Sequence, residues 1–386
     1  MTTLHWLFLE PLDVLLLRGN QLFGDAGSYG QSLMPPWPSV AAGAIRSRIL
    51  VDAGIPLAEF AAGKHEHAAL CTPEKPGTFT LCALHLARRN SENVEPLLPA
   101  PADLFIPSDE KEAPQLLRPA PLPAGLASST PLPQLPMLAR QGRGKPAAGS
   151  HWLTPAGWQK YLRGQAPART DMLPASELWS TDERTGVGLK GATRSAEDGR
   201  LFANSAVCMK KDVGFAAAVA GIDAVPTDGL LRFGGDGRAV AVHHLPIAIP
   251  QPDWDAIAQQ KRCRLILASP GVFTYGWLPN GFTREGDAWR FALHGVRARL
   301  VAAAVPRHAT ISGWDLARHQ PKDAQRIAPT GSVYWLDDLD ATPAALRQLA
   351  ADGLWGTPCE DDARRAEGFN RLHIAQWNEK SEKQEH

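Results

Sequence analysis

Glycines flanked by basic residues make the segment from Arg184 to Lys211 the part of the chain best suited to contact phosphates. Glycine lets backbone N–H groups approach an anion, and Lys and Arg supply the charge that dominates nucleic-acid affinity. The segment holds six basic and two acidic residues, which gives a local charge of +4. A solvated hairpin loop explains the same residues, so a binding interpretation and a surface interpretation both stay open.

A second basic cluster spans Arg297 to Arg326, again with six basic and two acidic residues. Trp314 lies inside this cluster. An exposed tryptophan can stack on an unpaired base, which is how single-stranded RNA is commonly held. Burial in a core is the alternative for this side chain.

Two glycine motifs match nucleotide-binding patterns in their residues but not in the residues around them. Gly186 to Gly191 reads as GxGxxG, but polar segments flank it where a dinucleotide fingerprint needs a strand and a helix. The run Gly142 to Lys145 is followed by Pro146, where a phosphate-binding loop needs Ser or Thr. We therefore expect no nucleotide cofactor.

Catalytic and metal-binding patterns are sparse. His65 and His67 are two residues apart and His243 and His244 are adjacent, but neither pair has the helical HExxH spacing. The five cysteines form no CxxC pair, which fits reduced thiols and argues against a zinc module. We expect no metal and no catalytic residue. A nuclease that uses one histidine as a general base leaves no such pattern, so it remains an alternative.

Length and composition indicate a globular chain of two domains with an insertion. At ~150 residues per domain, 386 residues exceed one ordinary core, and 44% hydrophobic against 21% charged residues is globular composition. Forty basic and forty acidic residues leave no overall positive field that would recruit nucleic acid. No apolar run approaches the ~20 residues of a membrane span, so we expect a cytoplasmic protein without a membrane partner.

The first half predicts strand, loop, helix and strand in that order. Residues 4–17 alternate in the strand manner and end in the turn signal Arg18-Gly19-Asn20. A long Gly/Pro loop then leads into a helix that has Val40, Ala44, Ile45 and Ile49 on one face. Residues 78–87 predict a second strand.

Prolines dominate the next segment, and strands dominate the second half. Residues 96–146 hold twelve of the thirty-three prolines, which predicts an extended insertion, either a flexible linker or a segment lying on a surface. Two helices are predicted, near 152–162 and 343–354, with Thr342 as N-cap of the second. Strands are predicted at 201–207, 214–219, 239–249, 262–268, 290–305 and 332–336. This order favours an α+β fold of ferredoxin-like type.

The opening residues, from "FLEPLDVLLLRGNQLFGDAGSYG" to "IRSRIL", resemble subunit three of the Cmr complex, a RAMP-superfamily family of type III-B CRISPR effectors. The resemblance continues in "DERTGVGLKGATRSAEDGRLFANSAV", "RFGGDGRAVAVHHLP" and "LASPGVFTYGWLP". It ends in "SGWDLARHQPKDAQRIAPTGSVYWL" and "GFNRLHIAQW". The six blocks stand in the family's order and cover most of the chain outside the Pro-rich insertion.

The resemblance implies two ferredoxin-like (RRM-like) domains of RAMP type with Gly-rich loops and a large insertion. The expected organisation is a first part of the N-terminal domain at 1–95, the Pro-rich insertion at 96–150, the rest of that domain at 151–255 and a C-terminal domain at 256–386. Members of this family grip the repeat-derived 5′ handle of the CRISPR RNA. They also dock the large polymerase-like subunit and the first backbone subunit, and they contact target RNA only through the guide.

The residues that match the family motifs form the expected RNA-binding set. They are Arg18, Asn20, Ser39, Arg46, Gly186, Gly188, Lys190, Arg194, Gly235, Arg238, Trp314, Lys322 and Arg326. Two positions depart from the family pattern: Asp236 replaces a more usual Glu, and Asn370 replaces a glycine after Gly368-Phe369. Asn tolerates positive φ, so the turn geometry can be kept.

The favoured hypothesis is a non-catalytic RNA-binding subunit that holds the 5′ end of a guide RNA while base pairing reads the target. The alternative is a metal-independent RAMP endoribonuclease that processes precursor CRISPR RNA with His65, His243 or His244 as base. A third interpretation is a structural adaptor whose contact with RNA is incidental.

Overall fold

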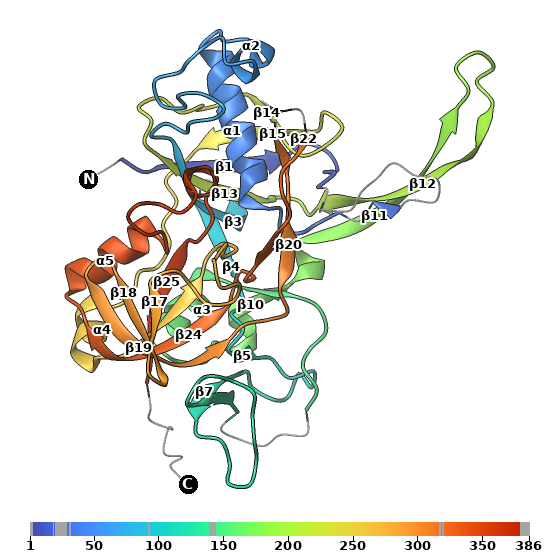
Figure 1. The fold of residues 1–386 in the computed structure, drawn as a ribbon. Helices are drawn as coiled ribbons and strands as arrows, with labels where there is room; N and C mark the ends of the chain where they lie inside the picture. Colours follow the sequence, from blue (N-terminus) through green and yellow to red (C-terminus); the bar gives the residue numbers. More distant parts are fainter. Residues whose placement is uncertain are drawn as a thin grey trace.

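The computed structural model describes residues 3–17, 19, 29–30, 32–91, 93–138, 144–315, 318 and 320–378. Two antiparallel sheets make up the body of the molecule, and a long hairpin stands out from it (Figure 1). None of the described helices is long and apolar enough to cross a membrane.

The N-terminal sheet has eight strands, all paired antiparallel. In spatial order they are β10 (Met172–Pro174), β9 (His151–Leu153), β4 (Asn93–Pro99), β3 (Thr80–Asn90), β13 (Val213–Ala220), β1 (His5–Pro11), β15 (Ala239–His244) and β14 (Leu230–Arg232). The strand near 78–87 is therefore confirmed with boundaries shifted by two or three residues, and the first strand is confirmed only as far as Pro11, six residues short of the predicted end at residue 17.

Helix α1 (Pro38–Asp52) covers one face of this sheet, as its apolar spacing predicts. Pro38 stands at the first helical position, where its missing N–H would have no partner. Ala41, Ile45 and Ile49 are buried in a core shared with the strands. A short helix, α2 (Leu57–Ala61), follows.

The C-terminal sheet has six antiparallel strands. In spatial order they are β17 (Phe282–Glu285), β18 (Ala288–Leu293), β19 (Val296–Ala304), β24 (Val333–Asp340), β16 (Cys263–Leu267) and β25 (Leu372–Gln376). Helices α4 (Trp254–Gln260) and α5 (Pro343–Asp352) pack on it, and α6 (Asp362–Ala366) follows α5. Thr342 caps α5 by accepting a hydrogen bond from Ala345 N, as predicted.

The single strand predicted at 290–305 is wrong, because the chain reverses inside it. His294 and Gly295 have φ of 48° and 78°, the positive values that a two-residue hairpin turn requires. The segment therefore forms the β18–β19 hairpin.

Asn370 also adopts positive φ, 59°, as expected of a residue that replaces glycine there.

The two sheets are joined by a buried charge network. Arg264 on β16 donates to Asp103 at 2.6 Å and to the carbonyl of Tyr161 at 2.8 Å. The Tyr161 hydroxyl donates to the other oxygen of Asp103 at 2.7 Å. Tyr161 belongs to α3 (Pro155–Leu162), the helix predicted near 152–162. Burial of this network raises the pKa of Tyr161 well above its usual range.

The Pro-rich segment lies on the protein surface and is not a free linker. It contains β5 (Leu104–Phe105), β6 (Gln115–Leu116), β7 (Arg118–Ala120) and β8 (Leu135–Met137), which form two short antiparallel pairs. Leu104 and Ile106 are buried in the core that joins the two sheets. Gln134 N donates to Val301 O of β19, which holds the segment to the C-terminal sheet. Two 3₁₀ turns, η1 (Arg169–Asp171) and η2 (Ala175–Glu177), follow α3.

Candidate nucleic-acid interface

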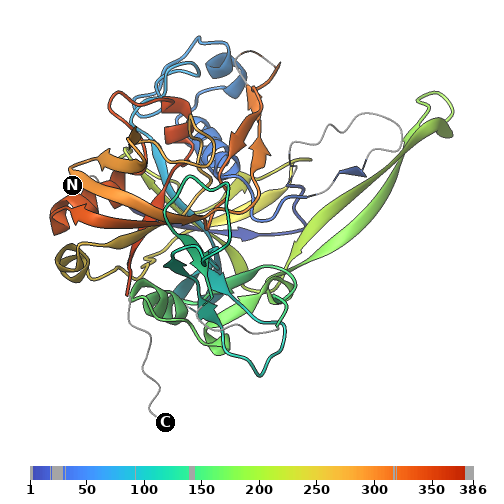
Figure 2. The same ribbon diagram turned by 60° about the horizontal axis from the view of Figure 1, so that its bottom comes forward.

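A two-stranded hairpin projects from the body of the molecule (Figures 1 and 2). Its strands β11 (Trp179–Leu189) and β12 (Ala196–Met209) pair from Trp179 opposite Met209 outward. At the base, Val207 forms a bridge with Leu15, and the Trp179 ring packs edge-on against Trp152 at 4.9 Å. β2 (Tyr29–Gly30) pairs with β12 farther along. The outer part of β11 has no buried residue, since its sequence lacks a repeating apolar face.

The predicted loop at Gly186 and Gly188 is wrong, because both glycines lie in β11 near its outer end. The pairing register shifts between Val187 and Leu189, so Gly188 stands at an irregularity of the kind that glycine in a strand often marks. The loop itself is the turn from Lys190 to Ser195. The sequence identified the segment but placed its loop a few residues too early.

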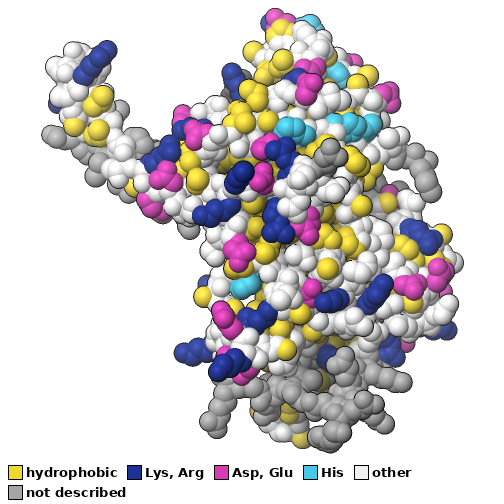
Figure 3. Space-filling model, turned by 180° about the vertical axis from the view of Figure 1, so that it is seen from behind, with side chains coloured by type: hydrophobic (Ala, Val, Ile, Leu, Met, Phe, Trp, Pro, Cys, Tyr) yellow, Lys and Arg dark blue, Asp and Glu magenta, His cyan; other side chains and the backbone are white. Residues whose placement is uncertain are grey.

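Lys190 and Arg194 occupy the turn at the end of the hairpin, and both are exposed. Arg194 N donates to Lys190 O at 2.8 Å, and Arg194 adopts a φ of 53°. No ion pair joins either residue to another described part of the chain. Val187 and Leu189 beside them are 44% and 55% exposed. Figure 3 shows basic and hydrophobic side chains together at this end.

The basic residues of the second cluster, Arg297 to Arg326, lie in two separate parts of the structure. Arg299 on β19 pairs with Asp337 at 2.6 Å, so it belongs to the sheet. The described residues of 309–327 instead form a narrow arm of β20 (Ala309–Ile311) with β23 (Gln325–Ile327) and β21 (Trp314–Asp315) with β22 (Gln320–Pro321). Trp314 is 56% exposed on this arm, and Arg326 is exposed. The core interpretation of Trp314 is therefore wrong.

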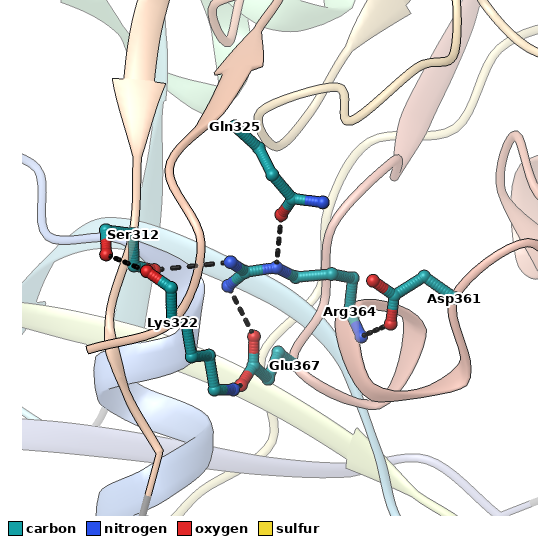
Figure 4. Close-up of polar contacts among 6 residues, drawn as sticks. All are labelled: Ser312, Lys322, Gln325, Asp361, Arg364 and Glu367. Carbon is teal, nitrogen blue, oxygen red and sulfur yellow. Dashed lines mark hydrogen bonds and ion pairs between the residues drawn. The ribbon is translucent and has the colours of Figure 1, made fainter. Parts of the chain in front are cut away.

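Lys322 on the arm contacts a buried carboxylate that the sequence did not single out (Figure 4). Its ammonium group donates to Glu367 at 2.7 Å, and Arg364 donates to the other oxygen of Glu367 at 3.0 Å. Arg364 also donates to Gln325 at 3.0 Å and to the Ser312 carbonyl at 3.2 Å. These bonds fasten α6 to the arm.

Arg46 on α1 faces the same carboxylate. Burial lowers the pKa of the Arg46 guanidinium, and the charge of Glu367 opposes that shift. Arginine keeps its charge in proteins, so the charge of Glu367 acts on three cations, Arg46, Lys322 and Arg364. Arg46 on α1 and Lys322 on the arm are therefore linked through the same carboxylate.

The loop carrying Gly235 and Arg238 packs against the loop that follows β1. Gly234 has a φ of 80°, and a side chain there would approach Leu16 O to 2.7 Å. Arg238 pairs with Asp13 at 2.5 Å and with Asp236 at 3.5 Å. The charge of Arg238 is therefore largely compensated within the protein, and its contact with RNA stays a prediction.

The remaining predicted residues belong to the loop before α1 and to that helix. Arg18 and Asn20 lie outside the described residues. Ser39 lies in the first turn of α1 and is half-buried. Seven residues, or about two turns, separate it from Arg46 along one helix.

The three histidines proposed for the nuclease alternative have partners outside the hairpin and the arm. His65 pairs with Glu59 at 2.7 Å beyond α2. His243 pairs with Glu10 at 2.9 Å on the N-terminal sheet, and His244 packs against the His5 ring at 5.9 Å. Across the described part of the chain, no three His, Cys, Asp or Glu side chains are grouped so that they could hold a metal ion.

Glu367 and Arg364 were missed because no local pattern marks them. Lys322 and Glu367 are 45 residues apart, and α6 reads in sequence as an ordinary charged helix. The short run Asp361-Asp362 with Arg364-Arg365 was the available signal, since it marks a capped helix rich in charge.

Comparison with known proteins identifies one family and one fold. The model of the family described as CRISPR-associated protein (Cas_Cmr3) matches residues 7–377. A chain of the "Cryo-EM structure of the Type III-B Cmr-beta bound to cognate target RNA and AMPPnP, state 1" matches with a TM-score of 0.51 and 12% identity, covering 95% of each chain. A chain of the "Cryo-EM structure of the Type III-B Cmr-beta bound to cognate target RNA" matches with a TM-score of 0.51 and 14% identity, covering 95% of this chain and 96% of the other. No curated protein matches.

Proposed function

This chain belongs to the Cas_Cmr3 family of CRISPR-associated proteins, and from that premise we propose that it grips the 5′ handle of a CRISPR RNA. It acts as a non-catalytic subunit of a type III-B effector complex. It docks the large polymerase-like subunit and the first backbone RAMP subunit, and it meets target RNA only through the guide. Base pairing then reads the target, while this subunit holds phosphates and a few unstacked bases.

We interpret each sheet as a ferredoxin-like unit. The strand order β15-β1-β13-β3 in the first sheet and β25-β16-β24-β19 in the second is the 4-1-3-2 order of an antiparallel ferredoxin-like sheet. Each unit keeps one of the two crossover helices among the described residues, α1 in the first and α5 in the second. RRM-type sheets of this kind are common RNA-binding scaffolds.

The projecting hairpin is the observation that carries the proposal. Its eleven-residue strand β11 extends about 35 Å, enough to reach several nucleotides. A two-stranded ribbon that buries little apolar surface gains little stability from its own packing, so its length serves a contact outside the body. Lys190 and Arg194 at its end offer charge to phosphates, and Val187 and Leu189 offer an apolar face to a base.

The arm and α1 supply the second contact. Glu367 neutralises only part of the charge of Arg46, Lys322 and Arg364. Arg326 and Trp314 on the same arm add an exposed charge and a stacking platform. A single-stranded RNA that runs from the hairpin to the arm would contact both of these surfaces.

A charge-reversal experiment tests the proposal. The double variant Lys190→Glu/Arg194→Glu is compared with the wild type for affinity to an RNA with a repeat-derived 5′ end, over a range of salt concentrations. Loss of two phosphate contacts lowers the salt slope by about 1.4, because each contact to a single strand contributes about 0.7. Lys64→Glu/Lys75→Glu is the matched control, since both lysines are exposed on the segment between α2 and β3. An unchanged slope in the hairpin variant would favour the adaptor interpretation.

The endoribonuclease alternative has its own test. His243 has a carboxylate partner, Glu10, and a carboxylate orients the histidine base in the Ser-His-Asp arrangement. Repeat-containing RNA is incubated with the protein and without metal, and the products are separated by size. A cleavage product that disappears in His243→Ala would establish the alternative and contradict the non-catalytic assignment.

A further inference from the structure

A cavity of about 460 Å³ lies where the two sheets meet. Its walls come from the loop before α1 and the first residue of that helix (33–38), from β3 (84–86), from the Pro-rich segment (99–101 and 104–106) and from the loop after β16 (268–270). The volume falls in the range of about 300–1,000 Å³ that is usual for small-molecule sites.

The cavity is uncharged and has a deep end and a mouth. The residues that line it include no Asp, Glu, Lys or Arg. Leu86, Trp152 and Phe215 at the deep end are at most 2% exposed. Pro35, Gly149 and Ser150 at the mouth are exposed to solvent. A ligand that enters must therefore present a neutral, largely apolar part to these walls.

Two buried polar side chains in the wall lack partners. His85 is 4% exposed, and neither of its ring nitrogens has a hydrogen-bond partner among the described residues. The indole nitrogen of Trp37 is likewise buried and unpaired within the described chain. Burial lowers the pKa of His85 to about 4, so the ring is neutral near pH 7 and offers one donor and one acceptor.

We propose that this cavity binds a nucleobase. A base is planar, neutral and aromatic, and it carries donors and acceptors on its edge that can satisfy His85 and Trp37. An aliphatic side chain of a partner protein would leave those polar atoms unpaired, which buried groups rarely tolerate. Lys145, exposed beside the mouth residue Pro146, is suited to a phosphate that stays outside. The inference rests on the proposed function and deepens it, because it names the place where one unstacked base would be held.

Two kinds of molecule supply such a base, namely a free nucleoside and an RNA. Titration with free nucleosides tests the first of them. Adenosine, guanosine, cytidine and uridine are titrated into the full-length protein by calorimetry and by the fluorescence of the tryptophans, of which Trp37 and Trp152 line the cavity. Ser150→Trp, at the exposed mouth, should weaken binding at least about tenfold by blocking entry, a difference well above error. Ser150→Ala is the matched control and should bind like the wild type.

The second source is a base within RNA. RNA carrying 2-aminopurine at successive positions of its 5′ end is mixed with the same proteins. Quenching at one position that Ser150→Trp abolishes would assign the cavity to that base. His85→Phe keeps a ring at this position but removes both nitrogens, so it should weaken binding while thermal melting shows that the protein is folded.

The inference fails if neither nucleosides nor 2-aminopurine RNA gives a signal that depends on Ser150→Trp. Such a failure leaves the RNA proposal intact, because the hairpin variant Lys190→Glu/Arg194→Glu tests that proposal at another place. Conversely, binding of a free nucleoside by a protein whose hairpin variant shows no change would support the cavity alone.

Discussion

The imidazole rings of His85 on β3 and His373 on β25 stack across the junction of the two sheets, with centroids 5.9 Å apart and planes inclined by 28°. Trp158 of α3 packs edge-on against His373 at 5.0 Å. Both nitrogens of His85 and Nε2 of His373 lack hydrogen-bond partners among the described residues. Two neutral rings therefore hold a contact that two charged rings would break.

Acid should weaken the junction through these histidines. Burial lowers the pKa of His85 to about 4, and burial with the proximity of His85 lowers the pKa of His373 to about 3, against 6.5 in the unfolded chain. Between pH 6.5 and 4 the unfolded chain binds more protons, so the free energy of unfolding falls as pH falls. The slope is about 1.4 kcal/mol per pH unit for each histidine.

Urea unfolding from pH 7.5 to pH 4.5 measures this slope. His85→Leu/His373→Leu should have a shallower slope than the wild type, and His65→Leu, on an exposed residue, should not change it. A double variant with the wild-type slope would show that other groups control the acid response.

The buried pair of Arg264 and Asp103 predicts a large stability effect. Asp103→Ala leaves Arg264 charged, buried and unpaired, which destabilises the fold by about 3–5 kcal/mol. Replacing both by apolar residues, as in Asp103→Leu/Arg264→Met, should recover much of the loss, because no charge is left buried. Denaturant midpoints measure both variants. Asp287→Ala, whose carboxylate is exposed 3.9 Å from Arg284, is the matched control and should leave the midpoint unchanged.

Replacing Glu367 should change the stability of the protein and its affinity for RNA in opposite directions. Glu367→Gln removes the anion that Lys322 and Arg364 share, so it should destabilise the protein. The released positive charge should raise affinity for RNA a fewfold at low salt, and less at high salt, because screening weakens it. Filter binding at two salt concentrations checks this. An affinity that does not change would remove the arm and α1 from the RNA-binding surface.

The Trp314 side chain should contribute to RNA affinity by stacking on a base but should not contribute to the stability of the fold. Trp314→Ala should lower RNA affinity by about 1–3 kcal/mol, the range for one stacked base. Its melting temperature should stay near that of the wild type, because the side chain is 56% exposed. Trp314→Phe should retain much of the affinity. Tyr275→Ala, at a 68% exposed aromatic residue, is the control for non-specific loss.

Local patterns in the sequence were sufficient for the regular elements. Thr342 before Pro343 marked the start of α5, since a threonine side chain accepts a hydrogen bond from a backbone N–H of the first turn, and Thr154 before Pro155 caps α3 in the same way. The spacing of Ala44, Ile45 and Ile49 marked the buried face of α1. The ordered motif blocks indicated the family that the comparison with known proteins then identified.

Contacts between distant residues could not be read from those patterns. His85 and His373 meet although they are 288 residues apart, and Lys322 meets Glu367 only because α6 packs beside the arm. Periodicity describes which face of an element is apolar, but it contains no information about which other element covers that face. The sequence therefore determined the elements, the clusters of charge and the family. The tertiary structure alone decided which charges are compensated, which stand free on the hairpin and where an uncharged cavity opens between the sheets.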